Sequence, residues 1–387
     1  MTQALPPPAA TPPPDDAPPD PATADRLTAR QSRLVWLAFR RHRLAVAGLV
    51  VTIGIYLVAL FAEFLAPYPP TQFDADYSYA PPQTVSFVRT GDDGQRVFGL
   101  HAKGLDVEVD PTTLEPAYTT DPDDVVELGF FVAGPEYRLF GLIPMEHRLF
   151  GPKDPDQRVH LLGADRNGRD ILSRIVHGAR ISMTIGLVGV VLAFVFGVVL
   201  GGISGYLGGR VDTAIQRLIE LFMSIPTLPL WLGLAAALPD DWSPMRRYFA
   251  ITVILAIIAW TELARVVRGK FLSLQREDYI VAAHLDGNGT ARMIGRHLLP
   301  SFTSHLVASL TLTIPAMILA ETSLSFLGLG LQAPVVSWGV LLQEAQNIRT
   351  VATAPWLLFP GLAVIAAVLA LNFVGDGLRD AADPYRR

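Results

Sequence analysis

The sequence predicts an all-α polytopic membrane protein with six transmembrane helices and a small β-containing insertion outside the membrane. The 387-residue chain is 50% hydrophobic and only 17% charged, whereas soluble domains average about a quarter charged residues. Several apolar runs are about 20 residues long, the length of a helix that crosses the hydrocarbon core of a bilayer. Two polar stretches interrupt these runs, so the rest of the chain is more apolar than its average composition.

The N-terminal segment 1–39 is rich in Pro, Ala and Asp. It has too little apolar surface to offset the entropy of ordering, so we expect a disordered tail. Arg40, Arg41 and Arg43 then flank the first apolar run, and 40–66 is the predicted N-terminal transmembrane helix. Basic residues beside a span favour the cytoplasmic side, so the tail is predicted to be cytoplasmic and the helix to run outward.

The next segment, 67–179, is polar and interrupted by Pro and Gly. Apolar and polar residues alternate in 83–89 and 105–109, which is typical of short strands. We therefore expect a periplasmic insertion with some β content, followed by an entry segment that leads back to the membrane.

Residues 180–387 form the predicted membrane core. Its five apolar runs cover 181–203, 214–238, 248–267, 302–326 and 356–374. Six spans that begin inside place both termini in the cytoplasm. The long connection 268–300 then lies on the cytoplasmic face, where its Lys and Arg residues are expected. The segment 328–347 is broken by Gly and Pro and is predicted to be an outer or re-entrant element.

The connection 268–300 holds the features most suited to a mechanical role. They are Asp278, the pair Ala282 and Ala283, then Gly287, and finally His297, Leu299 and Pro300. Paired Ala residues permit close backbone approach, and Gly permits a sharp turn. Pro disfavours the helical conformation at the residue before it, so it marks a boundary before the next span. From these residues alone, an ordinary amphipathic surface helix and a docking element for a cytoplasmic partner are equally good interpretations.

Small residues and prolines mark other positions in the core. Small residues recur at every fourth position in 193–205, which predicts close packing of two membrane helices. Pro226 and Pro315 fall within predicted spans and would free backbone groups. Such breaks fit a translocation path but do not require one.

Three carboxylates lie in or near the predicted spans. Glu220 and Glu262 each have an Arg three residues away, so local ion pairs are expected. Glu321 lies deeper and has no such neighbour. It either lines the translocation path or hydrogen-bonds another helix.

The spacing of the connection resembles that of a known family. Ala-Ala, three residues, Gly, twelve residues and Pro are similar to the EAA loop of ABC import permeases, although Val281 stands where Glu is usual. Further motifs resemble the C-type permease subunits of oligopeptide and dipeptide ABC transporters, the binding-protein-dependent transport system inner membrane components. These motifs occupy 162–170 with 178–182, 205–209, 324–330 and 375–380, and the resemblance covers 40–64 and 161–384.

The resemblance implies one N-terminal helix followed by a five-helix ABC importer permease core in the bacterial inner membrane. It also implies that the loop at 268–300 docks on an ATPase and transmits its movement. The partners implied are a homologous second permease, two cytoplasmic ABC ATPases and a periplasmic substrate-binding protein. The chain would bind no cofactor itself, because ATP and Mg²⁺ belong to the ATPases. Di- or oligopeptides are the implied substrate, while similar permeases take up oligosaccharides, opines or nickel.

Other function classes fit the sequence less well. No Gly-x-x-x-x-Gly-Lys-Ser/Thr motif is present, the chain has no Cys, and its net charge of −5 argues against nucleic-acid binding. An ion-coupled secondary transporter would show inverted repeats and several buried acids. A membrane-anchored enzyme would need catalytic spacing among the acids and histidines of 67–179, and none is recognised. We therefore predict no catalytic residue and no metal site.

Overall fold

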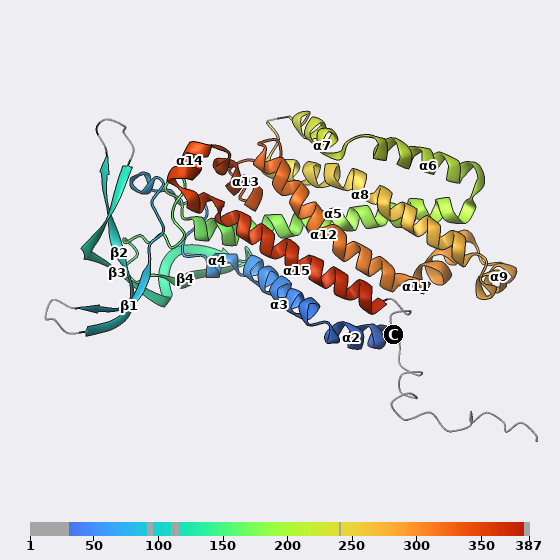
Figure 1. Ribbon diagram of the computed structural model, residues 1–387, viewed down its shortest axis with the longest axis horizontal. Helices are drawn as coiled ribbons and strands as arrows, with labels where there is room; N and C mark the ends of the chain where they lie inside the picture. The colour runs from blue at the N-terminus through green and yellow to red at the C-terminus, as the bar shows by residue number, and fades with distance from the viewer. Residues whose placement is uncertain (1–30, 91–95, 110, 112–115, 240, 383–387) are drawn as a thin grey trace, which may run out of the picture.

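The computed structural model describes residues 31–90, 96–109, 111, 116–239 and 241–382. The expected disorder of residues 1–30 therefore lies outside the described residues. A long helical bundle carries a small β-sheet at one end, and helix α9 (Asp278–Leu285) lies at the opposite end (Figure 1). The molecule is thus mostly helical, as the sequence predicts.

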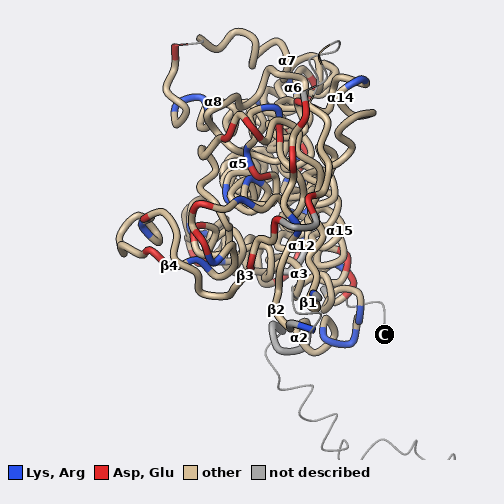
Figure 2. Tube along the Cα trace, turned by 90° about the vertical axis from the view of Figure 1, so that its left-hand side faces the viewer, with Lys and Arg blue, Asp and Glu red and all other residues tan. Residues whose placement is uncertain are grey.

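Five long helices build the bundle, and each is long and apolar enough to cross a membrane. They are α3 (Arg43–Leu60), α5 (Ile171–Leu207), α8 (Pro244–Leu274), α12 (Thr303–Phe326) and α15 (Phe359–Ala382). Most of the tube in Figure 2 is tan, because charged side chains are sparse along these helices. The helices overlap the predicted spans and extend several residues beyond some of them.

The predicted span 214–238 is not one continuous helix. The chain instead forms α6 (Gly209–Ser224) and α7 (Thr227–Ala236), which are bent by 86° relative to each other. Ile225 is extended, with φ −91° and ψ 128°, and Pro226 follows it. A residue that precedes proline is disfavoured in the α conformation, and proline provides no N–H group, so the helix breaks here.

The predicted disorder of 31–39 is also wrong, because Gln31–Arg41 forms helix α2. Phe39 is 2% exposed and packs in a cluster with Ala45 of α3 and Val374 of α15. The Pro-rich composition of the tail does not extend into this helix. A short helix, α4 (Ala62–Leu65), continues the line of α3 at the sheet end of the bundle.

Helix α5 begins where a tight turn closes on Asp165. The Oδ1 atom of Asp165 accepts hydrogen bonds from the backbone N–H groups of Asn167 and Arg169 at 2.8 and 3.1 Å. The same carboxylate pairs with the buried Arg174 on the first turns of α5. Asp170 then caps the helix, since its side chain accepts from the N–H group three residues on at 2.7 Å. The motif at 162–170 therefore fixes the entry of the chain into the bundle.

Helices α5 and α8 pack in close contact through the small residues of α5. A Cβ atom added at Gly201 would lie 2.4 Å from the carbonyl oxygen of Ala264, and one at Gly197 would lie 2.8 Å from Leu263. Real side chains do not approach so closely, so only glycine fits at these two positions. The prediction of close helix packing from 193–205 is confirmed.

The sheet is antiparallel with strand order β1-β2-β3-β4. Its strands are β1 (Val85–Thr90), β2 (Arg96–Val109), β3 (Pro116–Leu139) and β4 (Ile143–Pro152). The first half of β3 pairs with β2 and the second half pairs with β4, so β3 joins the two parts. A small apolar core of Ala102, Val126, Leu128 and Val159 lies beneath it.

Short elements connect the long ones. They are η1 (Ala75–Tyr77), α10 (Thr290–Arg292), η2 (Met293–Leu298), α11 (Leu299–Ser301), α13 (Trp338–Leu342), η3 (Gln343–Gln346), α14 (Ile348–Thr353) and η4 (Pro355–Leu358). The last four lie between α12 and α15 at the sheet end of the bundle (Figure 1).

Candidate functional site

The connection between α8 and α12 folds around α9. Asp278 is the first residue of this helix and Gly287 lies in the turn that follows it. Gly287 has φ +74°, and the side-chain amide of Asn288 donates to the carbonyl oxygen of Ala283 at 2.8 Å. A left-handed residue just beyond a helix end is the position where glycine is most favoured. The sharp turn predicted at Gly287 is therefore present.

One face of α9 is packed against the bundle. Ile280 and Ala283 are 3% and 7% exposed, and they join a cluster that contains Phe271 at the end of α8. Met293 and Leu298, on the π-helical turn η2, are fully buried in the same cluster. The connection is therefore held on the ends of the long helices by an apolar core of its own.

The other face of α9 is exposed and partly apolar. Tyr279, Val281 and Leu285 are 47%, 46% and 82% exposed, and Asp278 and Ala282 are exposed beside them. Apolar side chains grouped on an exposed surface are typical of contact sites for another protein or a membrane.

The rest of the predicted loop leads back into the bundle. His297 is half-buried on η2, while Leu299 and Pro300 begin α11. Leu299 is half-buried and Pro300 is exposed. The structure thus places all seven predicted loop residues on one continuous surface element, with only Ala283 fully inside the core.

Hydrogen bonds tie this end of α8 to α5 and α6. Arg268 donates from Nε and Nη2 to the two carboxylate oxygens of Asp212, each at 2.6 Å. Asp212 also accepts from the Ser204 hydroxyl at 2.5 Å. Gln275, just beyond α8, donates to the carbonyl oxygen of Gly205 at 2.9 Å. A displacement of α9 and α8 would therefore act directly on α6.

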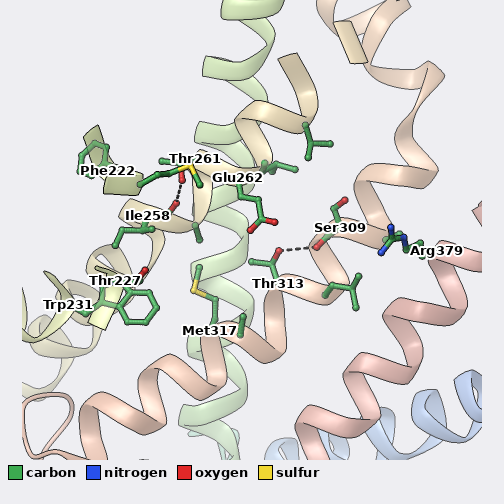
Figure 3. A pocket seen from close by; sticks show the side chains of 17 residues that line it. Phe222, Thr227, Trp231, Ile258, Thr261, Glu262, Ser309, Thr313, Met317 and Arg379 are labelled. Atoms are coloured by element: carbon green, nitrogen blue, oxygen red, sulfur yellow. Dashed lines mark hydrogen bonds between the residues drawn. The ribbon is translucent and has the colours of Figure 1, made fainter. Parts of the chain in front are cut away.

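A cavity of about 560 Å³ lies between α6, α7, α8, α12 and α15 (Figure 3). Its walls are largely apolar, with Phe222, Met223, Trp231, Ile258, Leu263, Val266, Leu312 and Met317 among the lining residues. Glu262 points into it from α8 and Arg379 from α15 (Figure 3). Because Phe222 and Met223 belong to α6, the helix tied to Arg268 also forms one wall of this cavity.

Two of the hydroxyl groups that line the cavity are already used in hydrogen bonds within their own helices. The hydroxyl of Thr261 donates to the carbonyl oxygen of Ile258 at 2.7 Å, and that of Thr313 donates to Ser309 at 2.9 Å (Figure 3). The indole Nε1 of Trp231 is buried and has no hydrogen-bond partner within the described part of the chain.

The three residues predicted for a translocation path are not among those that line the cavity. Pro226 caps the start of α7 at the bend, and Pro315 lies inside α12 without ending it. Glu321 is fully buried, and its Oε1 accepts from the hydroxyls of Ser325 and Ser337, each at 2.8 Å. Of its two interpretations, the structure favours the second, in which Glu321 hydrogen-bonds another segment.

The remaining two carboxylates behave differently from each other. Glu220 accepts from Arg217 at 2.6 Å, so the expected ion pair is present. Glu262 instead faces the cavity. Its exposure could not be read from the spacing to Arg265, because the spacing says nothing about which helices surround it. Among the described residues, no group of three or more His, Asp or Glu side chains could hold a metal ion.

Five helices that are long and apolar enough to cross a membrane, packed around a cavity, are the architecture of a multi-pass membrane protein. Comparison with known families makes this specific. Residues 197–387 match the family model described as binding-protein-dependent transport system inner membrane component. Residues 30–82 match the N-terminal TM domain of oligopeptide transport permease C. Strands β1 to β4 lie between these two matched regions.

Individual relatives agree with the family models. The chain is 37% identical over 235 residues to the dipeptide transport system permease protein DppC of Bacillus subtilis, which covers 60% of this chain and 71% of that protein. It is 40% identical over 229 residues to the oligopeptide transport system permease protein OppC of Escherichia coli K12, which covers 59% and 73%. The solved MetNI methionine ABC transporter gives a TM-score of 0.42 at 19% identity, over 55% of this chain and 98% of that chain.

The chain therefore belongs to the family of binding-protein-dependent transport system inner membrane components, as the resemblance of its motifs predicts. It is a permease subunit of an ABC importer and a multi-pass protein of the bacterial inner membrane.

Proposed function

We propose that this subunit forms half of the path through which a binding-protein-dependent ABC importer takes up di- or oligopeptides. The observation that carries the proposal is a continuous physical connection from α9 to the cavity. Helix α9 packs on the end of α8, Arg268 of α8 binds Asp212 of α6, and α6 lines the cavity.

The proposed topology has six spans, in which α6 and α7 together count as one bent span. Both termini and α9 are cytoplasmic, and the sheet is periplasmic. The position of α2 and α9 at the end of the bundle opposite the sheet supports this arrangement (Figure 1). Arg40, Arg41 and Arg43 lie at that same end, where a cytoplasmic excess of basic residues is expected.

The proposed partners follow from the same surfaces. Two cytoplasmic ABC ATPases bind ATP and Mg²⁺, and one of them docks on the exposed face of α9 at Tyr279, Val281 and Leu285. A homologous second permease closes the cavity from its open side, and a periplasmic binding protein delivers the substrate. Closure of the ATPases displaces α9, and α8 with Asp212 carries that displacement to the cavity wall. The chain itself binds no cofactor in this scheme.

A peptide substrate fits the chemistry of the cavity. A free peptide carries an ammonium group at one end, a carboxylate at the other and carbonyl oxygens between. Glu262 and Arg379, which line the cavity, supply charges opposite to those of the two ends. Relatives named as dipeptide and oligopeptide permeases support the same substrate class.

The test is uptake by proteoliposomes that contain this chain together with its partner permease and ATPases. Ligands that co-purify with the binding protein are first identified by native mass spectrometry. We expect short peptides among them, and we expect uptake of those peptides to require ATP and the binding protein. Recovery of only oligosaccharides, opines or nickel would refute the substrate class. Uptake by the chain alone without ATP would refute the importer mechanism.

A further inference from the structure

The β3–β4 hairpin exposes an unusual number of large apolar side chains. Phe131 is 64% exposed, Phe140 42%, Leu142 81% and Ile143 52%. Three of these four lie at the tip, where the register pair Leu139↔Ile143 closes the hairpin. In water, such a group of exposed apolar side chains would be unfavourable, which indicates that another apolar phase covers it.

The backbone of the tip points to the same conclusion. Phe140 has φ +54° and Gly141 has φ +72°, and Leu142 N–H donates to the carbonyl oxygen of Leu139 at 3.1 Å. Phe140 and Gly141, the two central residues of the β-turn 139–142, are therefore both left-handed, a conformation in which Asn, Asp or Gly is favoured. A phenylalanine is strained there, so the fold tolerates an aromatic ring at a position where a small polar residue would be easier to accommodate.

The hairpin folds back along the end of helix α3. The ring centroids of Phe64 and Phe131 are 6.0 Å apart near its base, and those of Phe61 and Phe140 are 5.5 Å apart near its tip. Between the helix and the hairpin lies a groove of about 480 Å³ lined only by apolar residues, Leu57 among them. The tip therefore lies level with the last turn of α3 and not beyond it.

The position of the hairpin tip along α3 determines its depth in the bilayer. Helix α3 is long and apolar enough to span a membrane, and only 22% of its most apolar window is buried. Leu57 and Leu60 in its last turn are 49% and 48% exposed. The exposed face of the hairpin thus continues the exposed apolar surface of α3 at the depth where a span meets the headgroup layer.

We propose that the β3–β4 hairpin rests in the interfacial layer of the same bilayer, with Phe140, Leu142 and Ile143 immersed in phospholipid. The sheet is then anchored to the membrane at a second place, beside α3. The proposal depends on α3 being a span and is independent of which substrate is carried and of which side the sheet faces. Continuity with the exposed surface of α3, through a groove without polar groups, favours lipid over a protein partner.

The absence of cysteine from the chain makes a direct test possible. Single variants Leu142→Cys and Ile143→Cys of the intact chain are labelled with a nitroxide and placed in nanodiscs of phosphatidylethanolamine and phosphatidylglycerol. Electron paramagnetic resonance then compares relaxation by oxygen, which concentrates in lipid, with relaxation by a nickel chelate, which stays in water. Glu108→Cys, at an exposed polar position on β2, is the aqueous control, and Val51→Cys, 45% exposed on α3, is the lipid control.

We expect labels at 142 and 143 to be relaxed several-fold more by oxygen than by the nickel chelate, as at 51, and the label at 108 to show the reverse. Labels at the hairpin that resemble the one at 108 would overturn the proposal. Labels shielded from both reagents would also overturn it, because they would show a protein occupant. If position 51 itself behaved as aqueous, the assignment of α3 as a span would fail, which is distinguishable from failure at the hairpin alone.

Discussion

Gly287 is held in a conformation that other residues adopt at a cost. Its φ is +74°, and no atom lies within 4 Å of the position of an added Cβ, so the cost of substitution is a backbone cost alone. For an L-residue this conformation costs roughly 1–2 kcal/mol. The turn after α9 therefore requires glycine because of its backbone conformation, and not because a larger side chain would clash with its neighbours.

We predict that Gly287→Val leaves membrane insertion and assembly intact but abolishes ATP-driven uptake, because the strained turn reorients α9 on its partner. Uptake in proteoliposomes and co-purification of the ATPases measure the two effects. Gly289→Val is the matched control, since Gly289 is also surrounded by open space but has an ordinary φ of −70°. Wild-type uptake by the Gly287→Val variant would contradict the coupling role of the loop.

Glu321 is a structural acceptor in the described chain. It joins Ser325 of α12 to Ser337, the residue that caps α13. We predict that Glu321→Leu destabilises the protein by roughly 1–3 kcal/mol for each hydroxyl left without an acceptor. Glu321→Gln retains an oxygen acceptor and should lose much less. Thermal unfolding in detergent measures both, and equal melting temperatures for wild type and Glu321→Leu would contradict this role.

At the level of residues, the sequence predicted the turn at Gly287 but not the surroundings of the carboxylates. Glycine at a helix end is a local signal, and its conformation depends on neighbours in the chain. The environments of Glu262 and Glu321 depend on which helices pack around them, and spacing along one helix carries no such information. Burial of Glu321 and exposure of Glu262 to the cavity are consequences of tertiary structure.

The bend between α6 and α7 divides one predicted span into two helices. Helix α6 carries Asp212 near its start and Phe222 near its end, so it connects the ion pair with Arg268 to the cavity wall. Pro226 breaks the helix, and the connection through α6 therefore ends there. The proline is visible in the sequence, but a helix can also continue through a proline, as α12 does at Pro315. Only packing decides between a break and a continuous helix.

We predict that Asp212→Asn lowers uptake by roughly 5-fold or more at unchanged ATPase activity, because coupling between two sites typically amounts to 1–3 kcal/mol. The substitution removes the charge that holds Arg268 through two hydrogen bonds. Glu220→Gln is the matched control: its pair with Arg217 lies on the same helix, and the two side chains are 60% and 77% exposed. The double exchange of Asp212 and Arg268 should restore part of the uptake. An effect of Glu220→Gln as large as that of Asp212→Asn would refute the specific link.

On the scale of the whole molecule, the predicted architecture is confirmed most fully where apolar length is decisive and is less complete elsewhere. Runs of about 20 apolar residues located the five long helices, since burial in lipid depends on length and composition. The extent of β3, 24 residues shared between two partners, could not be predicted from short alternating stretches. Helix α2 was missed because the Pro-rich composition of its neighbour obscured the apolar face around Phe39.

The sheet and the bundle are joined at Arg148. Arg148 is 2% exposed, and its Nη1 donates to the carbonyl oxygens of Glu63 and Ala66 at 3.1 and 2.9 Å. These carbonyls belong to the end of α4, where backbone acceptors lack intrahelical donors. Its guanidinium also lies over the ring of Tyr137, 5.0 Å from the centroid. A single side chain of β4 therefore fastens the hairpin to the helix that leaves the membrane.

We predict that Arg148→Leu lowers the free energy that holds the sheet on the bundle by roughly 1–3 kcal/mol, because two buried carbonyl groups lose their hydrogen-bond donor. The loss should be local: proteolysis within 116–152 is expected to accelerate, while the thermal unfolding of the bundle changes little. Arg96→Leu, at an exposed position on β2, is the control and should leave the cleavage rate unchanged. Unaltered proteolysis of the Arg148→Leu variant would mean that the aromatic contacts of Phe61 and Phe64 suffice to hold the hairpin against the membrane.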